Sequence, residues 1–72
     1  MGMITENDLK LGKRIKKYRK LAGFTQDQLA EKVRLSTKYI QFIEAGSRKP
    51  SLKTVYRLAK ALNVKVQDLF PF

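Results

Sequence analysis

Two helix-start signals stand close together in the middle of the chain and limit what can form between them. Thr25 and Gln28 have the spacing of a capping box, in which each side chain accepts from the other residue's backbone N–H. Ser36 is the next residue of a type that caps a helix N-terminus well. A helix that begins after Thr25 must therefore end within about nine residues. Two helices this short, joined by about three residues, cannot pack in parallel and must cross steeply.

A longer helix is predicted ahead of this pair. Its apolar residues fall within a stripe of about 60° on one helix face, which is typical of a helix packed on a core. These residues are Leu11, Ile15, Tyr18 and Ala22. Gly23 follows as the expected left-handed C-cap, and Phe24 is placed to cover the helix end. Leu9 falls on the opposite side of this helix, where the pattern gives it no partner.

The rest of the chain continues with short helices. One is expected from Thr37 towards Ala45, with Gly46 as its stop, and another between Ser51 and Asn63. The apolar face of the latter consists of Leu52, Val55, Leu58, Ala59 and Leu62. The segment 64–70 indicates a last turn or short helix. No stretch alternates with period two for long enough to form a strand. We therefore expect residues 1–72 to form a single compact all-α domain of four to five helices.

The charge balance points to a polyanionic partner. Sixteen Lys and Arg against six Asp and Glu leave a formal net charge of +10. A protein this basic attracts nucleic acid first and an anionic membrane second. No apolar run is long enough to span a bilayer, and the narrow apolar stripe of the first helix argues against a membrane-surface helix. We expect a cytoplasmic protein with no membrane partner.

The chain contains neither Cys nor His. Their absence removes disulfides, thiolate zinc sites, the commonest general base and the commonest metal ligand. The six acidic residues are scattered, so no catalytic constellation can be assembled from them. We expect no enzyme activity, no metal and no cofactor. We also expect no small-molecule ligand, because no further domain is present to sense one.

The stretch from Gln26 to Ile43 meets the demands of a helix-turn-helix. Two crossing helices need apolar inner faces, which are supplied by Leu29, Val33, Leu35, Ile40 and Ile43. They also need a small residue where they approach most closely, and Ala30 stands there. The turn prefers Gly because one of its residues adopts the left-handed conformation. Arg34 occupies that position, at a cost of about 1–2 kcal/mol.

From Leu11 to Phe70 the chain resembles the lambda-repressor/Cro-like (XRE-type) helix-turn-helix family. The features that match in joint spacing are Thr25-Gln26, Leu29-Ala30, Ser36, Ile40, Ile43-Glu44-x-Gly46, Pro50-Ser51 and Ala61-Leu62-Asn63-Val64. Arg34 departs from the pattern. The resemblance implies a lambda-repressor-like fold, with the helix-turn-helix at about residues 25–45, and sequence-specific binding of double-stranded DNA.

The helix after Ser36 divides into two faces. With Ile40 pointing inward, Ile43 and Glu44 lie within about 60° of it. The side chains that point the other way are Lys38, Gln41, Phe42 and Ala45. Outward residues near the start of a recognition helix reach base edges. The residues expected to read bases are Thr37, Lys38, Gln41 and Phe42, and the resemblance implies this role for all but Gln41. The alternatives are a solvated lysine at Lys38 and a lone exposed aromatic ring at Phe42.

Contacts to the DNA backbone are expected on either side of this helix. Gln26 opens the preceding helix, where free N–H groups favour a phosphate, and the resemblance implies such a contact for a glutamine there. The other expected phosphate-binding residues are Ser36, Tyr39, Arg48 and Lys49. Tyr39 lies between the two faces, so packing is an alternative for it. Arg48 and Lys49 have the alternative of a solvated basic loop.

An inward-facing Glu44 needs a partner, because an unpaired buried carboxylate is very costly. Arg19 lies at the edge of the first helix's apolar stripe, and the resemblance also places an Arg–Glu pair at these positions. The alternative is a Glu44 that is solvated at the helix end.

A transcriptional regulator acting as a homodimer on a two-fold operator is the expected function, with half-sites about 34 Å apart. The expected dimer contact is the apolar C-terminal end, which comprises Leu62, Val64, Leu69, Phe70 and Phe72. Alternatively, these residues close the core of the monomer. The alternative function is an antitoxin-like DNA-binding module whose main partner is another protein.

Overall fold

The computed structural model of the protein describes residues 5–70, which fold into helices joined by short turns. The helices are α1 (Glu6–Leu21), α2 (Gln26–Val33), α3 (Thr37–Glu44), α4 (Leu52–Leu62) and α5 (Val66–Leu69). Within residues 5–70 there is no β-strand, so the predicted all-α class and the upper of the two predicted helix numbers are confirmed. None of the helices in this range is long and apolar enough to cross a membrane.

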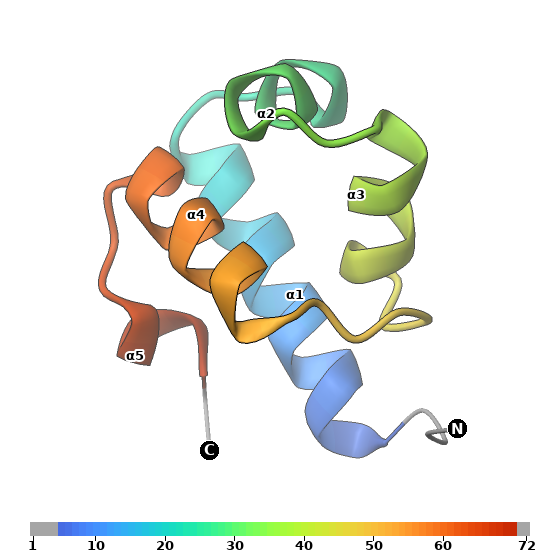
Figure 1. Ribbon diagram of the computed structural model, residues 1–72. Coiled ribbons are helices and arrows are strands. Elements are labelled where there is room, and N and C mark those ends of the chain that lie inside the picture. The colour runs from blue at the N-terminus through green and yellow to red at the C-terminus, as the bar shows by residue number, and fades with distance from the viewer. Residues whose placement is uncertain (1–4, 71–72) are drawn as a thin grey trace.

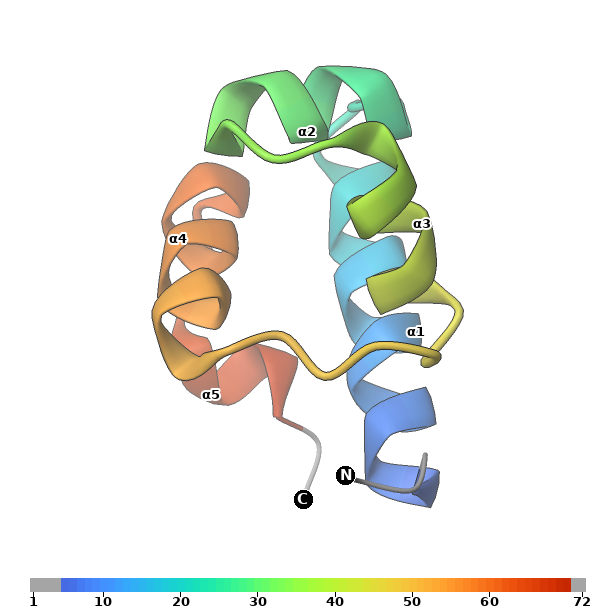
Figure 2. The same ribbon diagram turned by 45° about the vertical axis from the view of Figure 1, so that its right-hand side comes forward.

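The helices enclose one core. Helix α2 lies across one end of the molecule and contacts α3 and α4, whereas α5 lies at the other end against α1 and α4 (Figure 1). Figure 2 shows α4 on one side of the molecule and α3 with α1 on the other. The buried apolar side chains that fill the space between them are Leu11, Ile15, Leu29, Ala30, Val33, Ile40, Ile43, Val55, Leu58, Ala59, Leu62 and Leu69.

The predicted helix-start signals form as expected. The Thr25 hydroxyl accepts from the Gln28 N–H at 3.1 Å, and the Gln28 side-chain oxygen accepts from the Thr25 N–H at 2.9 Å. The Ser36 hydroxyl accepts from the Tyr39 N–H at 3.0 Å and caps α3. These two caps fix the residues at which α2 and α3 begin, and the second one also limits the length of α2.

The ends of α1 and α2 also follow the sequence signals. Gly23 has φ +81°, and the Phe24 N–H donates to the Arg19 carbonyl, which closes the end of α1. Arg34 adopts φ 58° and ψ 44°, so the turn before α3 keeps its left-handed residue although that residue is not glycine. The Arg57 guanidinium of α4 donates to the Val33 carbonyl and satisfies the last turn of α2.

Leu9, unexplained by the periodicity of α1, lies against the turn after α3. A Cβ atom built on Gly46 would stand 2.6 Å from Leu9 Cδ2, and Gly46 has φ +77°. This position therefore requires glycine both for its backbone conformation and for space. Leu9 packs on a neighbouring turn instead of on the core, which is why it falls outside the core stripe.

The C-terminal end requires a correction. Leu62 and Leu69 are 4% and 0% exposed, so both belong to the core of the monomer and their assignment to a dimer contact is wrong. The physical reason is that α5 turns back onto α1 and α4 and directs Leu69 inward. Val64 and Phe70 are half-buried at the edge of the core. Phe72 lies outside the described residues.

Candidate nucleic-acid interface

Helix α3 presents a sharply divided surface. Ile40, Ile43 and Glu44 are buried, whereas Lys38, Gln41 and Phe42 are exposed, Phe42 to 37%. The exposed side chains occupy successive turns of the helix on the side that faces away from the core. The structure thus brings three of the four expected base-reading residues into one outward row, and half-buried Thr37 stands at the head of the helix.

A buried polar network holds α3 in place. Arg19 Nε donates to Glu44 Oε2 at 2.7 Å and Arg19 Nη2 donates to Glu44 Oε1 at 3.1 Å, so the pairing is bidentate. The side chains of Arg19 and Glu44 are only 9% and 3% exposed. Arg19 Nη1 also donates to the Phe24 carbonyl at 2.8 Å. Because both charges find partners in two directions, the network can fix the rotation of α3 without leaving a buried charge unpaired.

Gln26 joins this network, which the sequence patterns did not indicate. Its Nε2 donates to Glu44 Oε1 at 3.1 Å. The primary amide has two N–H donors, so the other remains able to reach a phosphate at the start of α2. A glutamine in this position can therefore link an outside phosphate to the buried pair.

Thr37 has a partner that was also not foreseen. Its hydroxyl donates to Asp27 Oδ1 of α2 at 2.6 Å, across the turn between the helices. Asp27 is exposed at the first turn of α2, which is the ordinary place for an acidic residue near a helix N-terminus. The sequence carries no local signal for this contact, because the two residues meet only through the crossing angle of α2 and α3.

The loop after α3 contacts Phe42 through Ser47 and Arg48. The Arg48 guanidinium lies over the Phe42 ring, 5.9 Å from its centre. The N–H and the hydroxyl of Ser47 both donate to the Phe42 carbonyl, at 3.0 and 3.2 Å. An expected base-reading side chain and an expected phosphate-binding side chain therefore lie in direct contact.

Lys49 is held at the edge of the same loop by α1. Its ammonium lies 3.8 Å from Asp8 Oδ2. The backbone N–H of Thr5 holds the pKa of Asp8 below its ordinary value, and the Thr5 hydroxyl and Lys49 add to this effect. Asp8 is therefore ionised at neutral pH and competes with any phosphate for Lys49.

The two remaining expected backbone contacts differ in exposure. Ser36 is exposed, and its oxygen already accepts the Tyr39 N–H, so only its hydroxyl hydrogen is available to a phosphate. Tyr39 is half-buried against the core. Tyr39 therefore lies between the buried and the exposed face of α3, as its position in the sequence predicts.

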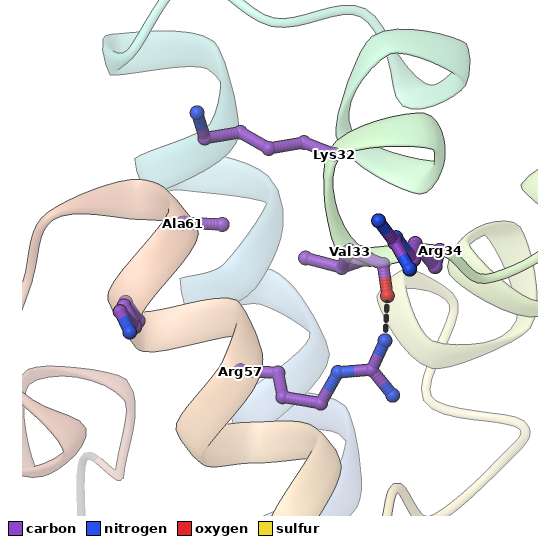
Figure 3. A pocket seen from close by; sticks show the side chains of 6 residues that line it. Lys32, Val33, Arg34, Arg57 and Ala61 are labelled. Carbon is purple, nitrogen blue, oxygen red and sulfur yellow. Dashed lines mark hydrogen bonds between the residues drawn. The ribbon is translucent and has the colours of Figure 1, made fainter.

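A second basic region lies on the α4 side of the molecule. An open groove of about 430 Å³ lies between the end of α2 and α4. Figure 3 shows the side chains that line it, with Arg57 reaching the Val33 carbonyl. Its lining residues are Lys32, Val33, Arg34, Arg57, Lys60 and Ala61. The groove is separate from the outward row of α3, since α3 and α4 lie on different sides of the molecule (Figure 2).

Comparison with known proteins identifies the family that the chain resembles. Residues 15–69 match the family model described as helix-turn-helix. An uncharacterised HTH-type transcriptional regulator of Archaeoglobus fulgidus is 41% identical over 59 residues, which cover 82% of this chain and 84% of the relative. The immunity repressor protein of Bacillus phage phi105 is 45% identical over 59 residues, which cover 82% of this chain and 41% of the repressor.

Solved structures show the same fold. The restriction-modification controller protein C.AhdI from Aeromonas hydrophila superposes with a TM-score of 0.88 at 32% identity, covering 92% of this chain and all of that one. The biofilm regulator SinR, solved in complex with DNA, gives a TM-score of 0.78 at 35% identity and covers 82% of this chain and 95% of its own. From its sequence and its fold, this chain belongs to the XRE-type helix-turn-helix family of DNA-binding transcriptional regulators.

Proposed function

We propose that the protein regulates transcription by binding a specific operator sequence in double-stranded DNA as a homodimer. The single observation that carries the proposal is the exposed row of Lys38, Gln41 and Phe42 on a helix whose opposite face is locked by the Arg19–Glu44 pair. A rigidly held helix with polar and apolar groups facing outward is what base recognition in the major groove requires.

The outward side chains differ in what they offer to a base. Lys38 can donate to guanine O6 and N7, Gln41 can bond adenine N6 and N7, and the Phe42 ring can pack on a thymine methyl group. Contacts from Gln26, Ser36, Arg48 and Lys49 to phosphates would set the register of α3 in the groove, because backbone contacts position a protein without reading sequence.

Selection of bound duplexes from a random pool tests the proposal. We expect one enriched sequence with two-fold symmetry and half-sites about 34 Å apart, which is one turn of DNA. Lys38→Ala should relax the preference at one base pair, whereas Gln26→Ala should weaken binding to all sequences alike. A pool that shows no enrichment would overturn sequence-specific binding, and an enriched sequence without symmetry would overturn the homodimer.

Val64 and Phe70 remain the expected dimer contact once Leu62 and Leu69 are assigned to the core. A second apolar pair, Leu52 and Tyr56, lies one turn apart on α4 and is 58% and 55% exposed. Sedimentation of Val64→Glu beside Tyr56→Glu separates the two surfaces. We expect Val64→Glu to be monomeric and Tyr56→Glu to remain dimeric; the reverse result would move the contact to α4.

A further inference from the structure

We infer that Asp27 is a positioning residue that determines which bases Thr37 can bind, because Asp27 fixes the direction of the Thr37 hydroxyl. This inference rests on the proposed function, since it concerns how the same surface selects its operator. It starts from the contact between Thr37 Oγ1 and Asp27 Oδ1 at 2.6 Å. That distance lies in the range of a charge-assisted O–H···O⁻ hydrogen bond.

The direction of this hydrogen bond follows from the chemistry of the two groups. An ionised carboxylate can only accept, and a hydroxyl has one hydrogen to donate. The hydrogen therefore lies on Thr37 Oγ1 and points to Asp27. What Thr37 can offer to a base is then restricted to the lone pairs of its oxygen and to its methyl group.

Base edges in the major groove divide by the same property. Adenine N6 and cytosine N4 carry N–H donors, whereas guanine presents only acceptors, and thymine presents O4 and a methyl group. Since Thr37 stands at the first position of α3, the part of a recognition helix that meets base edges, its oxygen should accept from adenine or cytosine. It should reject guanine, because guanine would place its acceptors against lone pairs.

Asp27 is well placed for this role and has no other bonded partner among the residues that the structure describes. It is exposed at the start of α2, so it does not serve the core. The helix dipole favours an acidic residue at this end of α2, but that effect requires no particular partner, whereas the 2.6 Å contact joins Asp27 to Thr37 alone among the described residues. Restriction of the Thr37 hydroxyl gives that carboxylate a function.

The test is a double-mutant cycle on Asp27 and Thr37, read as base preference. The base pair that Thr37 reads is first located as the one at which Thr37→Val changes the preference of the selected operator. Affinities are then measured for four operators that differ only at this pair. The preference is a ratio within each variant, so any change in stability cancels from it.

In Asp27→Ala the hydroxyl is released and can donate to guanine or thymine. We therefore expect the discrimination at this pair to fall about three- to tenfold, the worth of one hydrogen bond. In the Thr37→Val background the same substitution should change nothing at this pair, because no hydroxyl is left to direct. Glu31→Ala is the matched control: it removes one exposed acidic group from the same helix, away from Thr37.

The outcomes separate the inference from the function on which it rests. If Asp27→Ala keeps the wild-type preference, or alters it equally in the Thr37→Val background, the inference is wrong while sequence-specific binding stands. If Glu31→Ala relaxes the same base pair, the effect is one of charge and the inference is again wrong. If the unmodified protein selects no sequence, it is the proposed function that fails.

Discussion

At the scale of single residues, the Arg19–Glu44 pair shows how the outward face of α3 depends on side chains that are themselves buried. The pair is buried and bidentate and joins α1 to α3. Arg19 also donates to the carbonyl of Phe24 after α1, and Glu44 also accepts from Gln26 of α2. The net contribution of the pair to folding is small if the two charges are replaced together by apolar groups, but either charge left alone is costly.

Arg19→Ala should therefore lower the free energy of unfolding by about 3 kcal/mol, because Gln26 is then the only side chain within residues 5–70 that bonds the Glu44 carboxylate. Urea unfolding measures the change. Lys10→Ala is the control, since its pair with Glu6 spans 3.8 Å between exposed side chains and should contribute less than about 0.5 kcal/mol. Equal effects of the two substitutions would show that Glu44 gains nothing from Arg19.

Arg34 is a residue-scale departure from what the turn prefers. At φ 58° its Cβ is strained by about 1–2 kcal/mol, and glycine would remove the strain while losing about 0.5–1 kcal/mol in entropy. Arg34→Gly should thus stabilise the protein by about 0.5–1 kcal/mol in thermal or urea unfolding. Asn63→Gly, at φ 57°, should give less, because asparagine tolerates this conformation. A loss of stability in Arg34→Gly would mean that the Arg34 side chain compensates for its backbone.

At the scale of elements, the sequence predicts what is local and misses what depends on helix orientation. The Thr25–Gln28 capping box and the Ser36 cap involve residues three apart, so spacing alone identifies them. The contact of Asp27 with Thr37 requires the crossing angle of α2 and α3, which periodicity does not fix. Apolar residues at the C-terminal end were ambiguous for a related reason: a hydrophobic side chain does not indicate whether it meets its own core or a second copy.

Gly12 is the clearest missed element-scale feature. It is buried in the middle of α1, and a Cβ there would stand 2.7 Å from the Glu44 carbonyl oxygen and closer still to that of Ile43. Both atoms belong to the backbone of α3, so they cannot move aside alone. Glycine lets α1 and α3 approach this closely, and the orientation of α3, the helix that we propose reads bases, depends on it.

Gly12→Ala should therefore weaken both folding and DNA binding. The gain in helix propensity is about 0.5–1 kcal/mol and the overpacking cost about 1–3, so we expect a net loss of about 1–2 kcal/mol in urea unfolding. Gly23→Ala is the control, since a Cβ there meets nothing within 4 Å and the cost comes only from placing alanine at φ +81°. Gly23→Ala should lose comparable stability but keep its operator affinity. An equal loss of affinity in the two variants would show that Gly12 has no particular role in placing α3.

At the scale of the whole molecule, the net charge of +10 is spread over more than one face. Lys10, Lys13, Arg14 and Lys17 line a shallow hollow along α1, while Gly12, between them in sequence, faces α3. These cations therefore project away from the side of the molecule that carries α3. The molecule measures 29 × 23 × 19 Å, whereas charges are screened beyond about 10 Å at 0.1 M salt. Cations on the far side should steer association at low salt without touching the DNA.

Two double substitutions that each remove two positive charges distinguish steering from contact. Arg48→Gln with Lys49→Gln should flatten the dependence of log affinity on log salt concentration by about 0.9 for each lost phosphate contact. Lys13→Gln with Lys17→Gln should leave that slope nearly unchanged and mainly slow association at low ionic strength, with base preference intact. Titrations over a salt series measure both. If the α1 variant flattens the slope as much as the loop variant, α1 contacts phosphates directly, and the protein wraps DNA around more of its surface than α3 and its flanking loop.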